Sequence, residues 1–67
     1  MSDSIELIAD ATFGLRVKIG DHVEQDQQLG LKYGSQDLLR SPAYGTVQDV
    51  TFDSDGHRFI ITITIQV

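Results

Sequence analysis

The stretch Arg58-Phe59-Ile60-Ile61-Thr62-Ile63-Thr64-Ile65-Gln66-Val67 decides the fold class. Its apolar side chains recur at every second position from Phe59 to Val67, and threonine and glutamine fill the outer positions between them. A period of two is typical of a β-strand with one buried face, and β-branched residues fit such a strand well. The stretch therefore predicts a strand over 58–67, which needs a neighbouring strand because a free apolar edge would aggregate.

Five shorter stretches show the same features, and turn residues separate them. No window carries apolar residues at helical spacing over three turns, and only 21–28 has room for a single helical turn. Short strands between regularly spaced turns are typical of a small sandwich or barrel. We therefore expect an all-β domain of seven to eight short strands. The additional strands are predicted at 4–8, 15–19, 28–33, 37–40 and 45–52.

A weak internal repeat indicates how these strands are arranged. Residues 6–14 align with residues 37–45 at an offset of 31, and both segments end in an aromatic residue followed by glycine, Phe13-Gly14 and Tyr44-Gly45. Two repeats are too few for a solenoid. They predict a closed, pseudo-two-fold sandwich with halves near 4–33 and 36–67, in which Phe13 and Tyr44 pack in the core or at corners.

The alternating positions also predict the hydrophobic core. We expect it to hold aliphatic and aromatic side chains from every predicted strand. They are Ile5, Leu7, Val17, Ile19, Val23, Leu29, Leu31, Leu38, Val47, Val50, Phe59, Ile61, Ile63 and Ile65.

Length and charge limit the function. The 67 residues make one domain, 1–67, and ten acidic against five basic residues leave a net charge of −5. This charge disfavours a phosphate-backbone binder, whose contact surface is basic. No apolar run reaches the roughly 18 residues of a membrane span, and the first residues lack the cationic start of a signal peptide. We expect a soluble, cytoplasmic domain without direct membrane insertion.

Three motifs resemble the barrel-sandwich hybrid fold, also called the biotinyl/lipoyl-like hammerhead. They are Val17-Lys18-Ile19-Gly20-Asp21-His22-Val23, Asp26-Gln27-Gln28-Leu29 and Ser41-Pro42-Ala43-Tyr44-Gly45-Thr46-Val47. The family pattern is V-K-V-G-D-x-V-x-x-G-Q-x-L, followed by A-P-x-x-G-x-V. The resemblance covers about residues 10–65. Asp26 replaces the usual glycine, and Asp tolerates the left-handed conformation better than most residues.

The chain departs from the biotin and lipoyl carriers at their attachment site. In the carriers, a lysine sits at the tip of a tight hairpin. Here the hairpin covers residues 29–39, and its tip reads Tyr33-Gly34-Ser35-Gln36. Lys32 is the only lysine nearby, and it is predicted on the strand before the tip. A carrier that uses Lys32 as its attachment site remains the alternative to a domain without a prosthetic group.

Residues 10–30 are similar to the N-terminal barrel-sandwich domain of the C component of the Rnf-type electron-transport complex. They are also similar to the related domain of the sodium-translocating NADH–quinone reductase alpha subunit. These domains lack the carrier lysine. The resemblance implies a packing or docking role within a redox assembly, toward a protein partner or a parent multidomain chain. It implies no cofactor and no small-molecule substrate at this domain.

The hairpin tip is the predicted contact surface for a protein partner. It comprises Tyr33, Gly34, Ser35 and Gln36, and we expect the Tyr33 side chain to be partly exposed.

The residues give weaker support for metal binding, enzyme activity or nucleic-acid binding. Asp53-Ser54-Asp55-Gly56 begins like a calcium loop, but the later ligand positions hold His57 and Thr64, so a hairpin turn is expected. His22 and His57 follow turn residues and are expected to be solvated rather than metal ligands. The serines stand in no recognisable nucleophile motif, so we expect no enzyme activity. A small nucleic-acid binder remains a third hypothesis, which the acidic charge disfavours.

Overall fold

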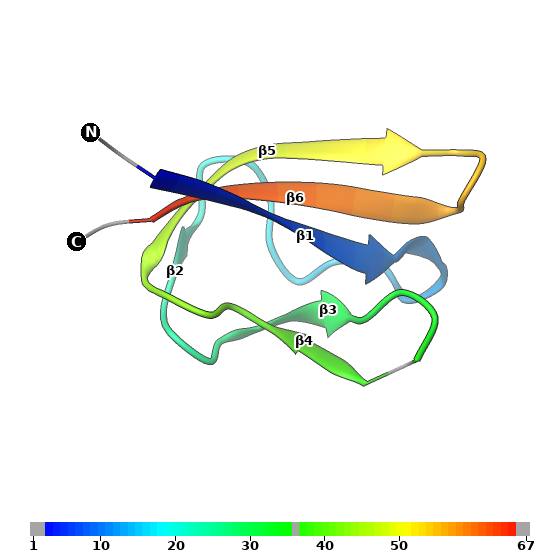
Figure 1. The fold of residues 1–67 in the computed structure, drawn as a ribbon, viewed down its shortest axis with the longest axis horizontal. Helices are drawn as coiled ribbons and strands as arrows, with labels where there is room; N and C mark the ends of the chain where they lie inside the picture. The colour runs from blue at the N-terminus through cyan, green and yellow to red at the C-terminus, as the bar shows by residue number, and fades with distance from the viewer. Residues whose placement is uncertain (1–2, 36, 66–67) are drawn as a thin grey trace.

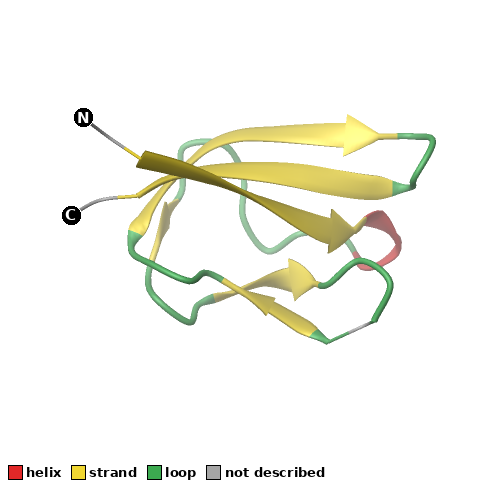
Figure 2. Cartoon of the chain, viewed as in Figure 1, coloured by secondary structure: helices red, strands yellow, loops and turns green. Residues whose placement is uncertain are grey.

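The computed structural model describes residues 3–35 and 37–65, and it is built from strands (Figures 1 and 2). One sheet has four strands in the order β1-β6-β5-β2, and a second sheet pairs β3 with β4. A single 3-10 turn, η1, follows β1. The elements are β1 (Asp3–Asp10), η1 (Ala11–Phe13), β2 (His22–Val23), β3 (Gln28–Leu31), β4 (Leu38–Arg40), β5 (Gly45–Asp53) and β6 (Arg58–Ile65). The all-β prediction is confirmed.

Strand β6, which the alternating sequence predicts as a strand with a neighbour, lies inside the larger sheet. It pairs antiparallel with β1 on one side and with β5 on the other. Ile61 and Ile63 are fully buried on its inner face. A bulge between Val47 and Asp49 shifts the register of β5 by one residue, which keeps both Val47 and Val50 on the inner face.

The pairing register shows that the chain folds back on itself around Gly34. Asp3 pairs with Ile65 in the β1–β6 pair, His22 with Thr46 in the β2–β5 pair, and Gln28 with Arg40 in the β3–β4 pair. In each pair the two residue numbers add up to 68, so the pairs are nested around one point. The two ends of the chain therefore lie together, and the β3–β4 hairpin lies at the other end of the molecule (Figure 1).

The core lies between the two sheets and confirms part of the predicted list. Val17, Val23, Leu29, Val47, Ile61 and Ile63 are buried, and Ile5, Leu7, Val50 and Phe59 pack against them half-buried. Leu31 and Ile65 are also half-buried. Two predictions are wrong, because the side chains of Ile19 and Leu38 are 58% and 42% exposed. Ala9 and Leu39 are buried in addition.

The sequence predicts a strand over 15–19, and this prediction is wrong. The backbone of the segment has no continuous partner, because it crosses from one sheet to the other. The Arg16 N–H donates to the Leu29 carbonyl oxygen in β3, whereas the Gly20 N–H donates to the Val47 carbonyl oxygen in β5. Val17 points inward at the crossing, and Ile19 is left on the surface. The described residues thus contain six strands instead of the predicted seven or eight.

The aromatic-glycine corners of the repeat also differ from the prediction. The Phe13 and Tyr44 side chains are exposed and do not pack in the core. The glycines that follow them have different conformations, because Gly14 has a φ of 73° whereas Gly45 is an extended residue of β5. The predicted tolerance of Asp26 for a left-handed bend is confirmed by its φ of 68°.

Ser41 is the one fully buried polar side chain among the described residues, and its hydrogen bonds explain why it is tolerated. Its Oγ donates to the Ala43 carbonyl oxygen at 2.6 Å. Its backbone N–H donates to the Gln27 carbonyl oxygen, and its own carbonyl oxygen accepts from the Asp26 N–H. These bonds hold the turn before β3 against the turn after β4.

No helix in the described part of the chain is long or apolar enough to cross a membrane.

Candidate functional site

The hairpin between β3 and β4 presents the predicted contact residues at its tip. The Lys32 N–H donates to the Asp37 carbonyl oxygen at 2.7 Å and closes the base of the loop. Gly34 turns the chain with a φ of 89°, a conformation that favours glycine. Tyr33 is 45% exposed, as expected, and Ser35 is exposed as well. Gln36 lies outside the described residues.

Lys32 lies at the base of this hairpin and not at its tip. Its backbone forms an antiparallel bridge with Ala9 of β1, in addition to its hydrogen bond to Asp37. The side chain is exposed. The side chain of Lys32 thus extends from a paired segment and not from an unpaired turn.

An ion pair on the neighbouring β5–β6 hairpin connects to Tyr33. The Arg58 Nε donates to Asp53 Oδ2 at 2.9 Å, and the Arg58 Cζ lies 5.5 Å from the centre of the Tyr33 ring. This hydrogen bond from Arg58 holds the pKa of the Asp53 carboxyl below its ordinary value. The Arg58 guanidinium thus links the tips of two hairpins through a cation–π contact and an ion pair.

The turn at 53–56 forms the β5–β6 connection, so the expected hairpin turn is confirmed. The Asp53 Oδ1 accepts from the Asp55 N–H at 3.1 Å, as Asp side chains commonly do in turns. His22 and His57 are exposed. Among the described residues, no three side chains of the His, Cys, Asp or Glu type come close enough together to hold a metal ion.

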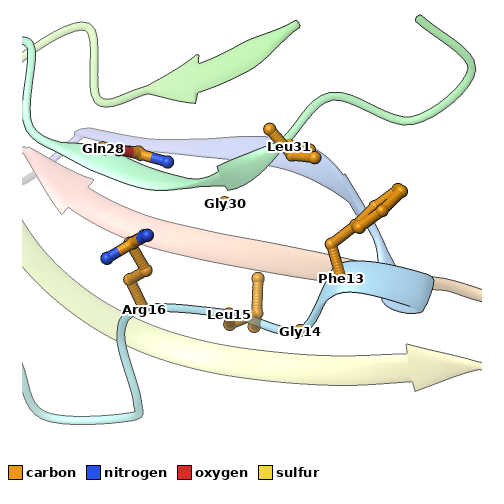
Figure 3. Close-up of a pocket in the computed structure, with 7 residues that line it drawn as sticks. All are labelled: Phe13, Gly14, Leu15, Arg16, Gln28, Gly30 and Leu31. Atoms are coloured by element: carbon orange, nitrogen blue, oxygen red, sulfur yellow. The ribbon is translucent and has the colours of Figure 1, made fainter. Parts of the chain in front are cut away.

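A groove of about 260 Å³ runs between residues 13–16 and β3, next to the hairpin (Figure 3). Phe13 and Leu31 form its apolar end, and Arg16 and Gln28 lie at its polar end. Gly30 leaves room on the floor, since a Cβ there would lie 3.2 Å from the Gly14 carbonyl oxygen. The groove is small compared with pockets for drug-sized ligands, which begin at roughly 300 Å³, and it suits one or two side chains.

Four apolar side chains lie on the groove and on the neighbouring hairpin, and we call them the tip surface: Phe13, Leu31, Tyr33 and Leu38. Phe13 and Leu31 share the groove, Leu31 is the register partner of Leu38, and Tyr33 comes two residues after Leu31 in the chain. Single exposed apolar side chains are common, but a contiguous group of them indicates an interaction site.

The sequence identifies Tyr33 as part of this surface but does not identify Phe13, Leu31 or Leu38. The pattern predicts that Leu38 packs inside the protein and that Phe13 packs in the core or at a corner. Alternation and a following glycine give no information on what covers a side chain. Comparisons of the chain with protein-family models, with curated proteins and with solved structures find no match.

Proposed function

We propose that the chain is a non-catalytic docking module of the barrel-sandwich, biotinyl/lipoyl-like type. In this proposal it binds a protein partner through the tip surface, within or alongside a cytoplasmic redox assembly or as part of a longer chain. It works as a fixed contact surface, without a prosthetic group of its own.

The strand pairing supports the barrel-sandwich arrangement. Ala9 pairs with Phe59 in the β1–β6 pair, and Gln28 pairs with Arg40 in the β3–β4 pair. The offset of 31 seen in the sequence relates Ala9 to Arg40 and Gln28 to Phe59. The same offset therefore relates the two strand pairs to each other, as expected for two halves that face one another. The offset of 31 places the counterpart of β5 at about residues 14–22. This segment lies beside β3, as β5 lies beside β6, but it does not form a continuous strand.

The exposed tip surface is the observation that carries the docking proposal. Burying two aromatic and two leucine side chains against a partner gains free energy, at about 25 cal/mol per Å² of apolar surface. The tip is also preorganised, because the Lys32–Asp37 hydrogen bond and the Arg58–Tyr33 contact restrict its conformation before binding.

Photo-crosslinking from the tip tests this proposal. A photoreactive phenylalanine analogue replaces Ser35, and the protein is irradiated in its native cells. We expect a specific crosslinked protein, which mass spectrometry identifies. The crosslink should be lost in Tyr33→Ala and retained in Tyr44→Ala, a matched control because Tyr44 is similarly exposed but precedes the start of β5, away from the tip.

Two outcomes contradict the proposal: the absence of a specific crosslink, and its equal loss in both tyrosine variants. The carrier alternative is tested separately by intact mass after coexpression with a biotin or lipoate ligase. A mass gain that disappears in Lys32→Arg would replace docking with a carrier function.

A further inference from the structure

The outer edge of β5 is covered along only part of its length. On one side, β6 pairs with β5 from Gly45 to Asp53. On the other side, β2 pairs only with Gly45 and Thr46, and Val47 bonds to Gly20 and Asp21. Within the described residues, the backbone of 48–53 has no hydrogen-bond partner on this side. Alternate N–H and C=O groups of this segment therefore have no strand to pair with, and Figure 1 shows no strand beside β5 on this side.

Apolar side chains lie next to this open edge on the inner face of the sheet. Val50 is half-buried against the core, and Phe52 is 51% exposed. The centre of the Phe52 ring lies 5.5 Å from that of the Phe59 ring at the rim of the core, and 6.0 Å from that of the exposed His57 ring. The core therefore ends before Phe52, and one more strand along the edge would cover this side chain.

The opposite face of the same edge is acidic. Asp49 and Thr51 are exposed there, and the Thr51 hydroxyl donates to Asp49 Oδ2 at 3.2 Å. Among the described residues, Asp49 takes part in no ion pair, in contrast to Asp53, which pairs with Arg58. The whole chain carries a net charge of −5. An added strand with basic side chains on this face would complement that charge.

We propose that residues 48–53 form a second binding surface, which accepts an extended strand of a partner protein by β-sheet augmentation. The partner strand has apolar side chains on one face, which cover Val50 and Phe52, and basic side chains on the other face, next to Asp49. Main-chain hydrogen bonds supply affinity in this mode of binding, and the alternating side chains supply specificity.

A second copy of the chain would bring two acidic edges together. If two β5 strands paired antiparallel around Thr51, Asp49 of one copy would lie opposite Asp53 of the other. Like charges directly across a strand pair are destabilising, and the two chains would each contribute a net charge of −5. A basic partner strand meets neither obstacle.

A defined peptide tests the proposal. The probe is the heptapeptide Lys-Ile-Lys-Val-Thr-Val-Lys with blocked ends, titrated into ¹⁵N-labelled protein at low salt. We expect saturable amide shifts concentrated in residues 48–53. Asp49→Lys should weaken binding about fivefold, whereas Glu24→Lys, the same charge change on an exposed turn, should change it less than about twofold. Tyr33→Ala should leave peptide binding unchanged, because the tip surface is separate.

A control peptide with N-methyl groups on the Ile and both Val residues separates strand addition from simple charge attraction. It keeps the side chains and charge but loses the backbone donors of the edge that would face β5 in an antiparallel pair with the apolar side chains on the inner face, so it should bind much more weakly. Equal binding of both peptides, shifts at 31–38 instead of 48–53, or no binding of the parent peptide would overturn the proposal. A dimer in sedimentation that excludes the peptide would also overturn it. None of these results affects the photo-crosslinking test of the tip surface.

Discussion

Gly45 shows how closely two strands of the larger sheet approach one another. It lies at the start of β5, opposite Ile65 of β6 and Val23 of β2. A Cβ at this position would meet the Thr64 carbonyl oxygen and would lie 2.8 Å from the Ile63 Cγ2. The obstacle is mostly backbone, which cannot move aside without breaking the sheet.

We therefore predict that Gly45→Ala lowers the free energy of unfolding by about 3 kcal/mol, because overpacking forces the strands apart. Gly34→Ala provides the comparison. Nothing lies within 4 Å of a Cβ there, so the cost is only the positive φ, about 1–2 kcal/mol. Urea unfolding of both variants measures the difference. A smaller loss for Gly45→Ala than for Gly34→Ala would show that β5 and β6 lie further apart than described.

Asp53 gives the stability of the protein a pH dependence of known sign. The Arg58 hydrogen bond lowers the pKa of this carboxyl below its ordinary value of 3.8. A lowered pKa in the folded state means that the ion pair stabilises the fold above the ordinary value. The stabilisation is lost as the pH falls through the lowered pKa.

We predict that Asp53→Asn is less stable than the wild type at about pH 7, and that the difference disappears by about pH 2. The loss is small, because the pair is solvated. Urea unfolding at the two pH values measures it. Asp49→Asn serves as the control, since it removes a carboxylate from the same strand without breaking an ion pair. A stability difference for Asp53→Asn that persists unchanged at low pH would contradict the assignment.

At the scale of the elements, strand β6 carries the core. Ile61 and Ile63 lie in the middle of the sheet and are fully buried. We predict that Ile63→Ala lowers the free energy of unfolding by about 2–5 kcal/mol through lost burial and a cavity. A domain of this size has only about 3–10 kcal/mol of stability, so Ile63→Asp should not fold.

The matched comparison is Ile19→Ala, which removes the same atoms from an exposed position. It should change the stability by no more than about 0.5 kcal/mol. Denaturant unfolding of the two alanine variants tests the corrected core directly. Similar losses at both sites would mean that Ile19 is buried after all, as its place in the alternating segment predicts.

The contrast between β6 and the segment 15–19 shows what alternation can predict. In both, every second side chain is apolar, and the pattern correctly indicates that Val17 and Ile63 point inward. Alternation gives no information on whether the backbone has a continuous partner. Residues 16 and 20 bond to different sheets, so no ladder forms. Burial also depends on whether another part of the chain covers the side chain. Alternation does not indicate this, and Ile19 and Leu38 are exposed.

The candidate site can be predicted only in part for a similar reason. The tip of the hairpin follows from local turn chemistry, because Gly34 supplies the positive φ that the turn needs. The remaining tip surface depends on contacts distant in sequence, such as the groove that Phe13 shares with Leu31. The open edge of β5 depends on β2 being only two residues long, which no local pattern indicates.

At the scale of the whole molecule, the nested strand pairs can be connected in two places. One is the hairpin in the middle of the sequence, and the other is a link between the two ends of the chain. The nested pairing makes these two connections equivalent. Asp3 lies opposite Ile65 at one end, and Lys32 bonds to Asp37 at the other. Either connection closes the same set of antiparallel pairs. The fold should therefore tolerate a chain whose two ends are joined and whose hairpin is cut, because exposed turns accept new termini more readily than strands do.

We predict that a circular permutant, joined from Val67 to Met1 by a short Gly-Ser linker and opened between Gly34 and Ser35, folds with the same strand pairs. Its free energy of unfolding should stay within about 2 kcal/mol of the parent, because loop-closure entropy depends only weakly on length. Amide NMR and urea unfolding measure both. A permutant opened between Val47 and Gln48 is the control and should not fold, because the cut falls within β5 at its bulge. If the permutant opened at Gly34 lost the β1–β6 pairs while the linker was intact, the hairpin would be required to establish the register, and the two connections would not be equivalent.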